Sequence, residues 1–234
     1  MCGRFFRRQP RDELAAAFRA TPFGDLAPAY NIAPSSSVYA VRFNAKTGER
    51  TLEPLQWGLI PHFAKDRKIA FKCINARAET VDTLPSFRTA FAKRRCLVVA
   101  SGFYEWFTKG KAKHPFAFVR SDYEPFGIAG VWENWQDPAT GEWIRSCAMI
   151  TTSANELVGT VHDRMPVILE PASYPHWLGE EPLHAHELKQ LLRPLRADLM
   201  AAWPVSSRMN TPKVDDLSVL DPIEVDPREQ PKLL

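Results

Sequence analysis

The sequence has few cysteines, little net charge and no long apolar run. Its four cysteines, at positions 2, 73, 96 and 147, include no Cys-x-x-Cys pair and no histidine at ligand spacing, which argues against a zinc site or a disulfide framework. The basic residues at the start are not followed by the apolar segment of a secretory signal, and no run approaches the length of a membrane span. We therefore expect a cytoplasmic protein with no metal, no other cofactor and no membrane partner.

What is present is typical of a soluble globular chain. Of the 234 residues, 45% are hydrophobic and 24% are charged, and the formal net charge of +3 is too small by itself to indicate a nucleic-acid partner. No internal repeat or low-complexity segment appears. We predict a monomer with a single domain over residues 1–225 and a flexible tail over residues 226–234.

Short apolar runs rich in β-branched and aromatic residues alternate with turn residues along the middle of the chain. Such runs predict strands, and their close spacing leaves no room for a helix between successive strands. We therefore predict an α+β fold, mostly antiparallel β, with a barrel-like or two-sheet core flanked by short helices. The expected strands cover residues 38–43, 52–57, 69–73, 96–100, 115–119, 126–132 and 146–151.

Helices are expected at the margins of this core. Pro10 begins one that carries Leu14 and Phe18 inward, since proline is favoured in a first turn. Ser153 and Glu156 have the spacing of a capping box, which predicts a second helix running toward residue 162. Two more are expected over residues 87–93 and 184–192.

Cys2 is the first candidate for chemistry, because removal of Met1 would leave one residue carrying both an α-amine and a thiol. These groups titrate near ~8 and ~8.5 in unfolded chains, so a fraction of each is expected to be deprotonated at neutral pH. The amine can form a Schiff base with an aldehyde, and the thiolate can then close a thiazolidine ring on the same carbon. The alternative is a cysteine without chemical function.

Three polar positions follow apolar runs and are further candidates. Glu105 lies between two aromatic residues, where partial burial would raise its pKa toward the range of a general acid or base, although it could equally face water. His162 could shuttle protons or could simply end a helix. Asn75, with Arg77 two positions further on a strand, could hold a substrate or could only anchor a loop.

Seven short motifs follow one another in a specific order. They are M-C-G-R at 1–4, Y-N-I-A-P at 30–34, W-G-L-I-P at 57–61, N-A-R-A-E-T at 75–80, G-F-Y-E-W at 102–106, H-D-R-M-P at 162–166 and P-V-S at 204–206. Together they resemble the motifs of the SOS response-associated peptidase (SRAP) family over nearly the whole chain. The resemblance implies a protein that shields abasic sites in single-stranded DNA, near junctions with double strands, by covalent attachment through Cys2.

The resemblance also implies that Met1 is lost, either autocatalytically, which is why the family is called a peptidase, or through a methionine aminopeptidase. On this reading Glu105 helps to open the abasic sugar to its aldehyde and Cys2 captures that aldehyde. His162 moves protons, and Asn75 binds the sugar hydroxyl or orients the terminal amine. The protein would then associate with the nucleoid when it acts.

The DNA contacts are assigned by residue type. Rigid bidentate donors suit phosphates, and apolar surfaces suit the bases beside the lesion, although the two tryptophans could instead belong to the core. The arginines are Arg4, Arg77 and Arg164, the base platforms are Pro34, Trp57, Phe63 and Trp106, and Asn31 completes the set. His62-Phe63 stands where family members commonly carry tryptophan, which predicts a smaller stacking surface.

Two other functions remain open at this stage. An N-terminal cysteine with its own amine as base could also serve a peptidase or amidohydrolase, which would turn over repeatedly. The chain could alternatively be a non-catalytic binder of single-stranded DNA, in which case blocking Cys2 would leave function intact.

Overall fold

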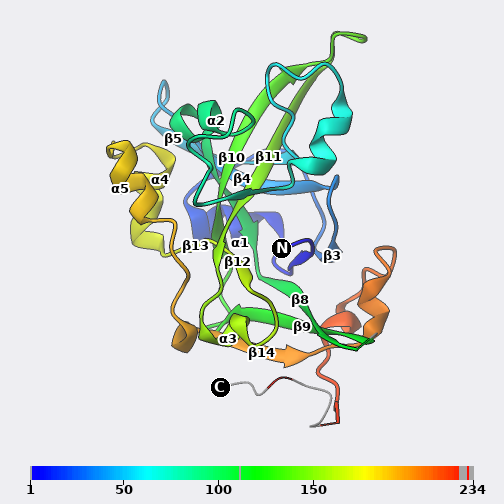
Figure 1. Cartoon of the computed structure of the whole chain (residues 1–234). Helices are drawn as coiled ribbons and strands as arrows, with labels where there is room; N and C mark the ends of the chain where they lie inside the picture. The colour runs from blue at the N-terminus through cyan, green and yellow to red at the C-terminus, as the bar shows by residue number, and fades with distance from the viewer. Residues whose placement is uncertain (1, 111, 227–230, 232–234) are drawn as a thin grey trace.

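The computed structural model describes residues 2–110, 112–226 and 231. Its ribbon shows a long pair of strands, β10 (Phe126–Gln136) and β11 (Trp143–Ser153), running through the molecule (Figure 1). Below them lie β8 (Gly102–Lys109), β9 (Ala112–Arg120) and β14 (Met200–Pro204). These strands belong to two sheets of nine and five strands. The α+β class with a mainly antiparallel, barrel-like core is therefore confirmed.

Five strands of the larger sheet close into a ring. β11 pairs with β10, β10 with β7, β7 with β4 and β4 with β5, all antiparallel. A parallel pairing of β5 with β11 sets Trp57 beside Cys147 and closes the ring. Side chains on both faces of β7 and of most of β10 are buried, which explains why these two strands are largely apolar in sequence. The ring strands are β4 (Ser37–Asn44), β5 (Glu49–Trp57), β7 (Arg95–Ala100), β10 (Phe126–Gln136) and β11 (Trp143–Ser153).

Short strands extend the larger sheet at its rim. Two of them matter for the site, because β6 pairs with β11 at residues 149–151 and β12 pairs with it at residues 151–153. β11 thus brings together two of the polar motifs, which are far apart in the sequence. The rim strands are β2 (Thr21–Pro22), β6 (Asn75–Arg77), β12 (Arg164–Pro166) and β13 (Ile168–Leu169).

The five-stranded sheet has the order β14-β9-β8-β1-β3. β1 lies between β3 and β8, with Phe5 opposite both Ile32 and Phe103. The amino-terminal segment is consequently an internal strand, which places Cys2 beside β8. The strands are β1 (Phe5–Arg7), β3 (Ala29–Ile32), β8 (Gly102–Lys109), β9 (Ala112–Arg120) and β14 (Met200–Pro204).

Short helices cover the barrel, as predicted. The apolar residues of α1, α2, α4 and α5 pack in one cluster with barrel side chains, and α4 and α5 lie on the left in Figure 1. The α-helices are α1 (Arg11–Phe18), α2 (Arg88–Lys93), α3 (Glu156–Gly159), α4 (Tyr174–Leu178) and α5 (Ala185–Gln190). The 3₁₀ helices are η1 (Arg67–Lys72), η2 (Pro171–Ser173), η3 (Ala197–Leu199), η4 (Ser207–Asn210) and η5 (Leu217–Leu220).

Two predictions about elements are wrong. Residues 69–73 do not form a strand, because Asp66 caps η1 by accepting a hydrogen bond from the Lys68 amide at 2.8 Å. Ser153 does not cap a helix, because it ends β11, and Asn155 instead accepts from the Val158 amide at 2.9 Å. No strand was predicted over β8, whose residues 102–106 entered the sequence analysis only as a motif.

Six other predicted strands and the three remaining helices are confirmed, with ends shifted by a few residues. Most of the predicted flexible tail, residues 226–234, lies outside the described residues. No helix in the described part of the chain has the length and apolar character that crossing a membrane requires.

Candidate active site

Cys2 lies where the two sheets meet. Its side chain is fully buried, in a core cluster that includes Phe5 and Trp57. Its carbonyl oxygen accepts a hydrogen bond of 2.7 Å from Nδ2 of Asn75, the first residue of β6. Since β6 pairs with β11, this bond ties the amino-terminal segment of the small sheet to the barrel.

Glu105 lies in the middle of β8, opposite Phe116 of β9, and only 2% of it is exposed. Burial raises the pKa of its carboxyl to about 7, against the opposing effect of the positive amino terminus. A carboxyl with this pKa is divided between its acid and base forms near neutral pH, which suits general acid–base work. The alternative of a glutamate facing water is wrong.

The thiol of Cys2 is not readily ionised in the folded protein. Burial raises its pKa well above the ordinary range, and the nearby charge of Glu105 raises it further. The expected thiolate fraction at neutral pH is therefore wrong for this environment, because a buried anion loses hydration. Any reaction at sulfur here requires a neighbouring base to take its proton.

His162 follows α3, and its amide donates to the Val158 carbonyl at 2.9 Å. Its Nδ1 accepts a hydrogen bond from the Arg164 amide at 3.0 Å and lies 3.0 Å from a carboxylate oxygen of Asp163. Burial lowers the pKa of the imidazole, and the positive amino terminus lowers it further. The ring is thus held in its neutral form near pH 7 and lies in the electrostatic field of the amino terminus.

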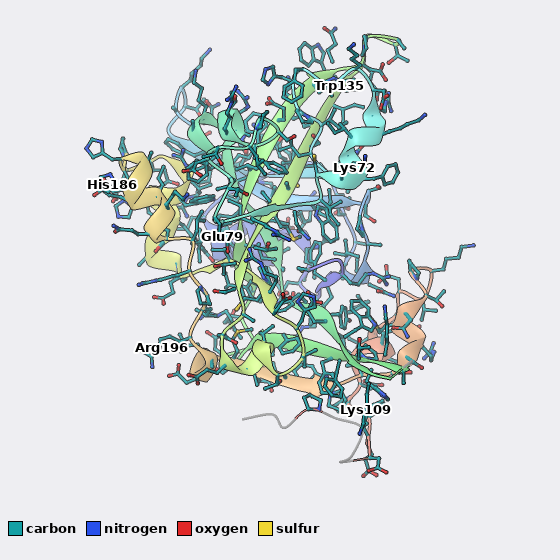
Figure 2. The ribbon with its side chains drawn as sticks, viewed as in Figure 1. Lys72, Glu79, Lys109, Trp135, His186 and Arg196 are labelled. Carbon is teal, nitrogen blue, oxygen red and sulfur yellow. The ribbon has the colours of Figure 1, made fainter. Side chains whose placement is uncertain are left out.

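The three predicted phosphate-binding arginines differ in what they contact. Arg77 is exposed on β6. Arg164 binds both carboxylate oxygens of Glu79, at 2.5 and 2.9 Å, and donates to the Thr151 carbonyl at 2.7 Å. Figure 2 shows Glu79 near the middle of the molecule. Arg4 donates to the Met209 carbonyl at 3.0 Å. Arg77 is therefore the most open of the three to a ligand phosphate.

The sequence as a whole decides the family. Residues 1–212 match the sequence model described as SOS response associated peptidase (SRAP). The chain belongs to the SRAP family. It is 41% identical over 217 residues to the abasic site processing protein YoqW of Bacillus subtilis, a match that covers 91% of this chain and 96% of the relative. The abasic site processing protein HMCES of Gallus gallus is 33% identical over 231 residues, covering 86% of this chain and 68% of that protein.

Solved structures agree with this SRAP fold. A crystal structure of a protein from Bacteroides thetaiotaomicron superposes with a TM-score of 0.87 at 25% identity, covering 95% of this chain and 100% of the other. A second, from Bordetella bronchiseptica, has a TM-score of 0.76 at 30% identity, covering 88% of this chain and 100% of the other.

Two residues of the SRAP motifs are not placed to contact DNA. Trp57 is fully buried, and its indole donates to the Ile74 carbonyl at 2.9 Å, so no base can stack on it in this conformation. Asn31 is 3% exposed, and its Nδ2 binds backbone carbonyls of the segment 209–214. Both residues hold the SRAP fold around the site, which corrects their assignment as DNA contacts.

Three other predicted base platforms remain accessible. Phe63 is 51% exposed. Pro34 and Trp106 are partly exposed, and the Trp106 indole is anchored to the side chain of Asn210 at 2.6 Å. Sequence reasoning missed Asn210. It also missed Phe71, which is 69% exposed next to Lys72, although an aromatic residue beside lysines is a recognisable signal for single-stranded nucleic acid.

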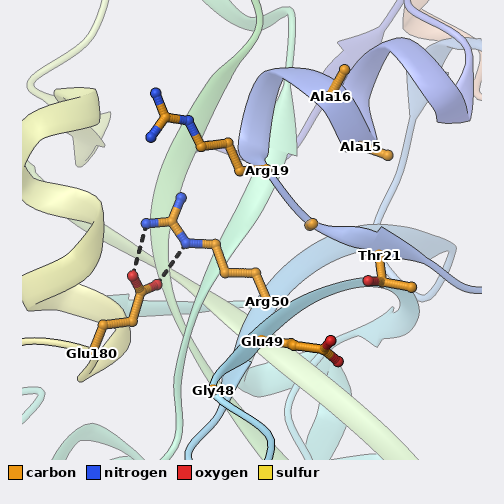
Figure 3. A pocket seen from close by; sticks show the side chains of 9 residues that line it. Ala15, Ala16, Arg19, Thr21, Gly48, Glu49, Arg50 and Glu180 are labelled. Atoms are coloured by element: carbon orange, nitrogen blue, oxygen red, sulfur yellow. Dashed lines mark hydrogen bonds and ion pairs between the residues drawn. The ribbon is translucent and has the colours of Figure 1, made fainter.

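A cavity of about 610 Å³ lies at the end of α1 (Figure 3). Arg50 spans it to bind both carboxylate oxygens of Glu180, at 2.6 and 3.0 Å, and it also donates to the Phe18 carbonyl. Its lining includes none of the predicted catalytic residues. Among the described residues, no group of three or more His, Cys, Asp or Glu side chains is placed to hold a metal ion.

Proposed function

We propose that this SRAP protein captures abasic sites in single-stranded DNA through Cys2 after loss of Met1, and that the product is a thiazolidine. The observation that supports the proposal is that the Asn75 side chain donates to the Cys2 carbonyl and that the buried carboxyl of Glu105 lies close enough to raise the pKa of the Cys2 thiol. Asp163, next to His162, in turn raises the pKa of Glu105. The printed names of the relatives YoqW and HMCES, abasic site processing proteins, support the choice of substrate.

The first step opens the sugar. An abasic deoxyribose is mostly a closed hemiacetal, and opening it moves one proton from the C1 hydroxyl to the ring oxygen. Glu105, with a pKa of about 7, can donate at one oxygen and accept at the other. The product is an aldehyde next to the terminal amine.

Capture of the aldehyde then takes two steps. The amine adds to the carbonyl carbon, and loss of one water gives the imine. The thiol of Cys2 adds across the C=N bond, so that a C–S bond and an N–H bond form and the S–H bond breaks. The bond from Asn75 to the Cys2 carbonyl limits rotation of the terminus and so keeps both nucleophiles near the same carbon.

The DNA strand would lie across the exposed groups around the terminus. Arg77 is suited to a flanking phosphate, whereas Arg164 would first have to leave Glu79. Phe63, Trp106 and Pro34 are suited to the unpaired bases and to a junction with double-stranded DNA. Since one chain supplies all these groups, we propose a monomeric, single-domain protein that acts in the cytoplasm on the nucleoid.

Incubation with a uracil-excised single-stranded oligonucleotide and intact-mass analysis test the proposal. Wild type should gain the mass of the abasic strand minus one water and keep it on heating. Cys2→Ala should give no heat-stable adduct, and Cys2→Ser should give only an imine that borohydride must trap. Cys73→Ala, which removes another buried thiol, is the matched control and should behave as wild type. A heat-stable adduct with Cys2→Ala would rule the mechanism out.

The peptidase in the family name could describe removal of Met1 by the protein itself. In that reaction one water is consumed, and the Met1–Cys2 bond breaks. The observation that favours it is Glu105 within the electrostatic field of both the Cys2 thiol and the amino terminus. Protein translated in a system without methionine aminopeptidase should lose Met1, and Glu105→Gln should retain it. Repeated release of a peptide product would instead indicate a hydrolase that turns over.

A further inference from the structure

A pocket of about 420 Å³ lies where α2 meets α4 and α5, which gather at the upper left in Figure 1. Its apolar lining includes Phe91 of α2 and Leu188 of α5, both of which belong to the cluster that packs the helices on the barrel. None of the residues assigned to abasic-site capture or to DNA binding lines it. Its volume is that of a ligand pocket.

Arg95 brings a partly buried cation to this pocket. Its Nε donates to the Trp177 carbonyl at 2.6 Å, and its Nη1 donates to the carbonyls of Phe91 and Ala92 at 3.0 and 3.1 Å. These bonds fasten the end of α2 to α4, and they leave Nη2 unused. Nη2 lies beside Gly179, where an added Cβ would be 3.3 Å away. Because Gly179 lines the pocket without a side chain, Nη2 stays open to a ligand.

The pocket carries positive charge that the fold does not neutralise. Among the described residues, no carboxylate pairs with Arg95 or with Arg88, the first residue of α2 and a further lining residue. The acid of the lining, Asp82, is neutralised by Lys189, whose Nζ lies 2.9 and 3.0 Å from the two carboxylate oxygens. By contrast, the arginine that spans the cavity of Figure 3 is paired with a glutamate. The pocket between the helices is therefore complementary to an anion.

The two arginines belong to opposite ends of α2, on either side of the apolar lining. The helix has six residues and is about 9 Å long; Arg88 begins it, and the Arg95 guanidinium is bound at its last turn. A ligand that reaches both arginines needs two anionic groups several ångströms apart, with an apolar group between them. In an extended peptide, the two neighbours of a residue are about 7 Å apart. A segment with an apolar residue between two acidic residues has this pattern.

We propose that this pocket docks an acidic peptide segment of a partner protein, whose apolar side chain enters between two carboxylates bound by Arg88 and Arg95. Guanidinium groups bind carboxylates through paired hydrogen bonds, and complementary charge gives such contacts their specificity. A DNA strand fits less well, because Phe91, the aromatic residue of the lining, is 3% exposed and gives a base no surface for stacking. The docking does not depend on abasic-site capture.

Binding of a synthetic peptide tests the proposal. The probe is acetyl-Glu-Asp-Phe-Asp-Glu-amide with a fluorescent label on a linker, and the matched peptide carries Gln and Asn in place of the acids. Anisotropy should give a Kd on the order of 10–100 μM for the acidic peptide, with binding about tenfold weaker for the neutral peptide and weaker at high salt. Amide NMR shifts should fall on residues 88–95 and 179–188. Equal binding of both peptides, or shifts confined to other residues, would overturn the proposal.

Three exposed positions of α2 locate the contact. Arg88→Glu should weaken binding of the acidic peptide about tenfold, and Ala92→Glu, which supplies a carboxylate inside the pocket, should weaken it at least as much. Lys93→Glu is the matched control, because it reverses a charge on the same helix outside the pocket lining. It should bind as wild type does. Equal weakening by Arg88→Glu and Lys93→Glu would overturn the proposal, because general attraction to a basic helix would then explain the binding.

Two competitors separate the peptide from other occupants. Phenylpropanoate, an apolar acid with one charge, should compete about tenfold more weakly than the unlabelled peptide, and an intact single-stranded oligonucleotide should not displace it. Equal competition by phenylpropanoate would indicate a site for small acids, and displacement by the oligonucleotide would indicate a DNA contact; either result rejects the peptide. The three variants should form the abasic-site adduct at the wild-type rate, so that docking and the proposed function are tested separately.

Discussion

The acidity of Glu105 follows from its place in β8. This strand is interior to its sheet, between β1 and β9, and both Tyr104 and Glu105 are almost wholly buried on its opposite faces. Burial removes water from the carboxyl in both protonation states, and the charged state loses more hydration free energy than the neutral state. Burial is the leading cause of its pKa of about 7.

This pKa predicts a specific dependence of stability on pH. The folded state holds the Glu105 proton more tightly than the unfolded chain, so stability declines as pH rises from about 4.5 through about 7. Relative to Glu105→Gln, the free energy of unfolding of wild type should fall by on the order of 3 kcal/mol over this range. The free energy of unfolding of both proteins can be measured by urea denaturation at several pH values.

Glu156→Gln is the control for that experiment, because Glu156 is an exposed acid in the first turn of α3. It should leave the pH dependence of wild type unchanged. If the curves of wild type and Glu105→Gln run parallel across the range, the carboxyl does not titrate near neutral pH in the folded protein.

The structure places the Asn75 side chain on the Cys2 carbonyl and the buried Glu105 near the Cys2 thiol. Residue-scale reasoning from sequence selected these residues together with His162, and their catalytic roles stay predictions. It was wrong about Trp57, because an aromatic residue looks the same in sequence whether it faces solvent or the core. Exposure depends on which strand packs against it.

At the scale of elements, η1 connects the W-G-L-I-P and N-A-R motifs and presents an unusual surface. Gly58 allows the close approach of this segment, because it has φ +126 and an added Cβ would lie 2.9 Å from the Ala70 carbonyl oxygen. Residues three apart in a 3₁₀ helix share a side, so Lys68 and Phe71 project together. Lys72 lies to the right of the centre in Figure 2.

An exposed aromatic residue between lysines predicts a further stacking contact for single-stranded DNA. Phe71→Ala should weaken binding of an abasic single strand by about fivefold, about 1 kcal/mol, while leaving the final yield of adduct at saturating protein unchanged. Fluorescence anisotropy should be measured with strands extended on one side of the lesion or the other. The effect should be confined to one of the two extensions.

Phe23→Ala provides the comparison, because Phe23 is 52% exposed but follows β2, outside η1. It should bind both strands as wild type does. Equal weakening by the two variants would show that loss of an exposed aromatic residue, and not its position in η1, explains the result.

The same segment shows why one element was assigned wrongly. Ile69 and Phe71 alternate with smaller residues, which is the local pattern of a strand. The deciding interaction is the cap at Asp66, together with burial of Ala70 against the barrel. A run of five residues with this composition is compatible with either state, and tertiary packing selects one.

At the scale of the whole molecule, the amino-terminal strand β1 and the segment 209–215 that follows β14 are both held beside the site. The amino-terminal segment is an interior strand, and Asn31 of β3 binds the carbonyls of Met209, Thr211 and Val214 at 3.0, 3.1 and 2.7 Å. Asp215 in turn accepts a 2.9 Å bond from the Asn31 amide. The segment 209–215, which follows β14, is thereby held against the side chains of Arg4 and Trp106.

Asn31→Ala should therefore destabilise the protein substantially. The substitution leaves buried carbonyls without their donor, which costs on the order of 2–3 kcal/mol. It also removes the bonds that hold the segment 209–215 beside Arg4, which itself donates to the Asn31 side chain. Urea denaturation should show this loss. Asn44→Ala, at the exposed end of β4 where the Asn44 side chain accepts from the Lys46 amide at 3.0 Å, should cost less than about 1 kcal/mol. Equal losses would contradict this account.

The sequence by itself determined the fold class, most of the strands and, through its ordered motifs, the family. Apolar runs and turn residues act locally, so their pattern can be recognised in the sequence alone. Only the tertiary structure decided that the Cys2 thiol resists ionisation, that Glu105 titrates near neutral pH and that Glu79 occupies Arg164. The burial of a residue and the partners of its side chain depend on which distant strand packs against it. Neighbouring residues in the sequence do not carry that information.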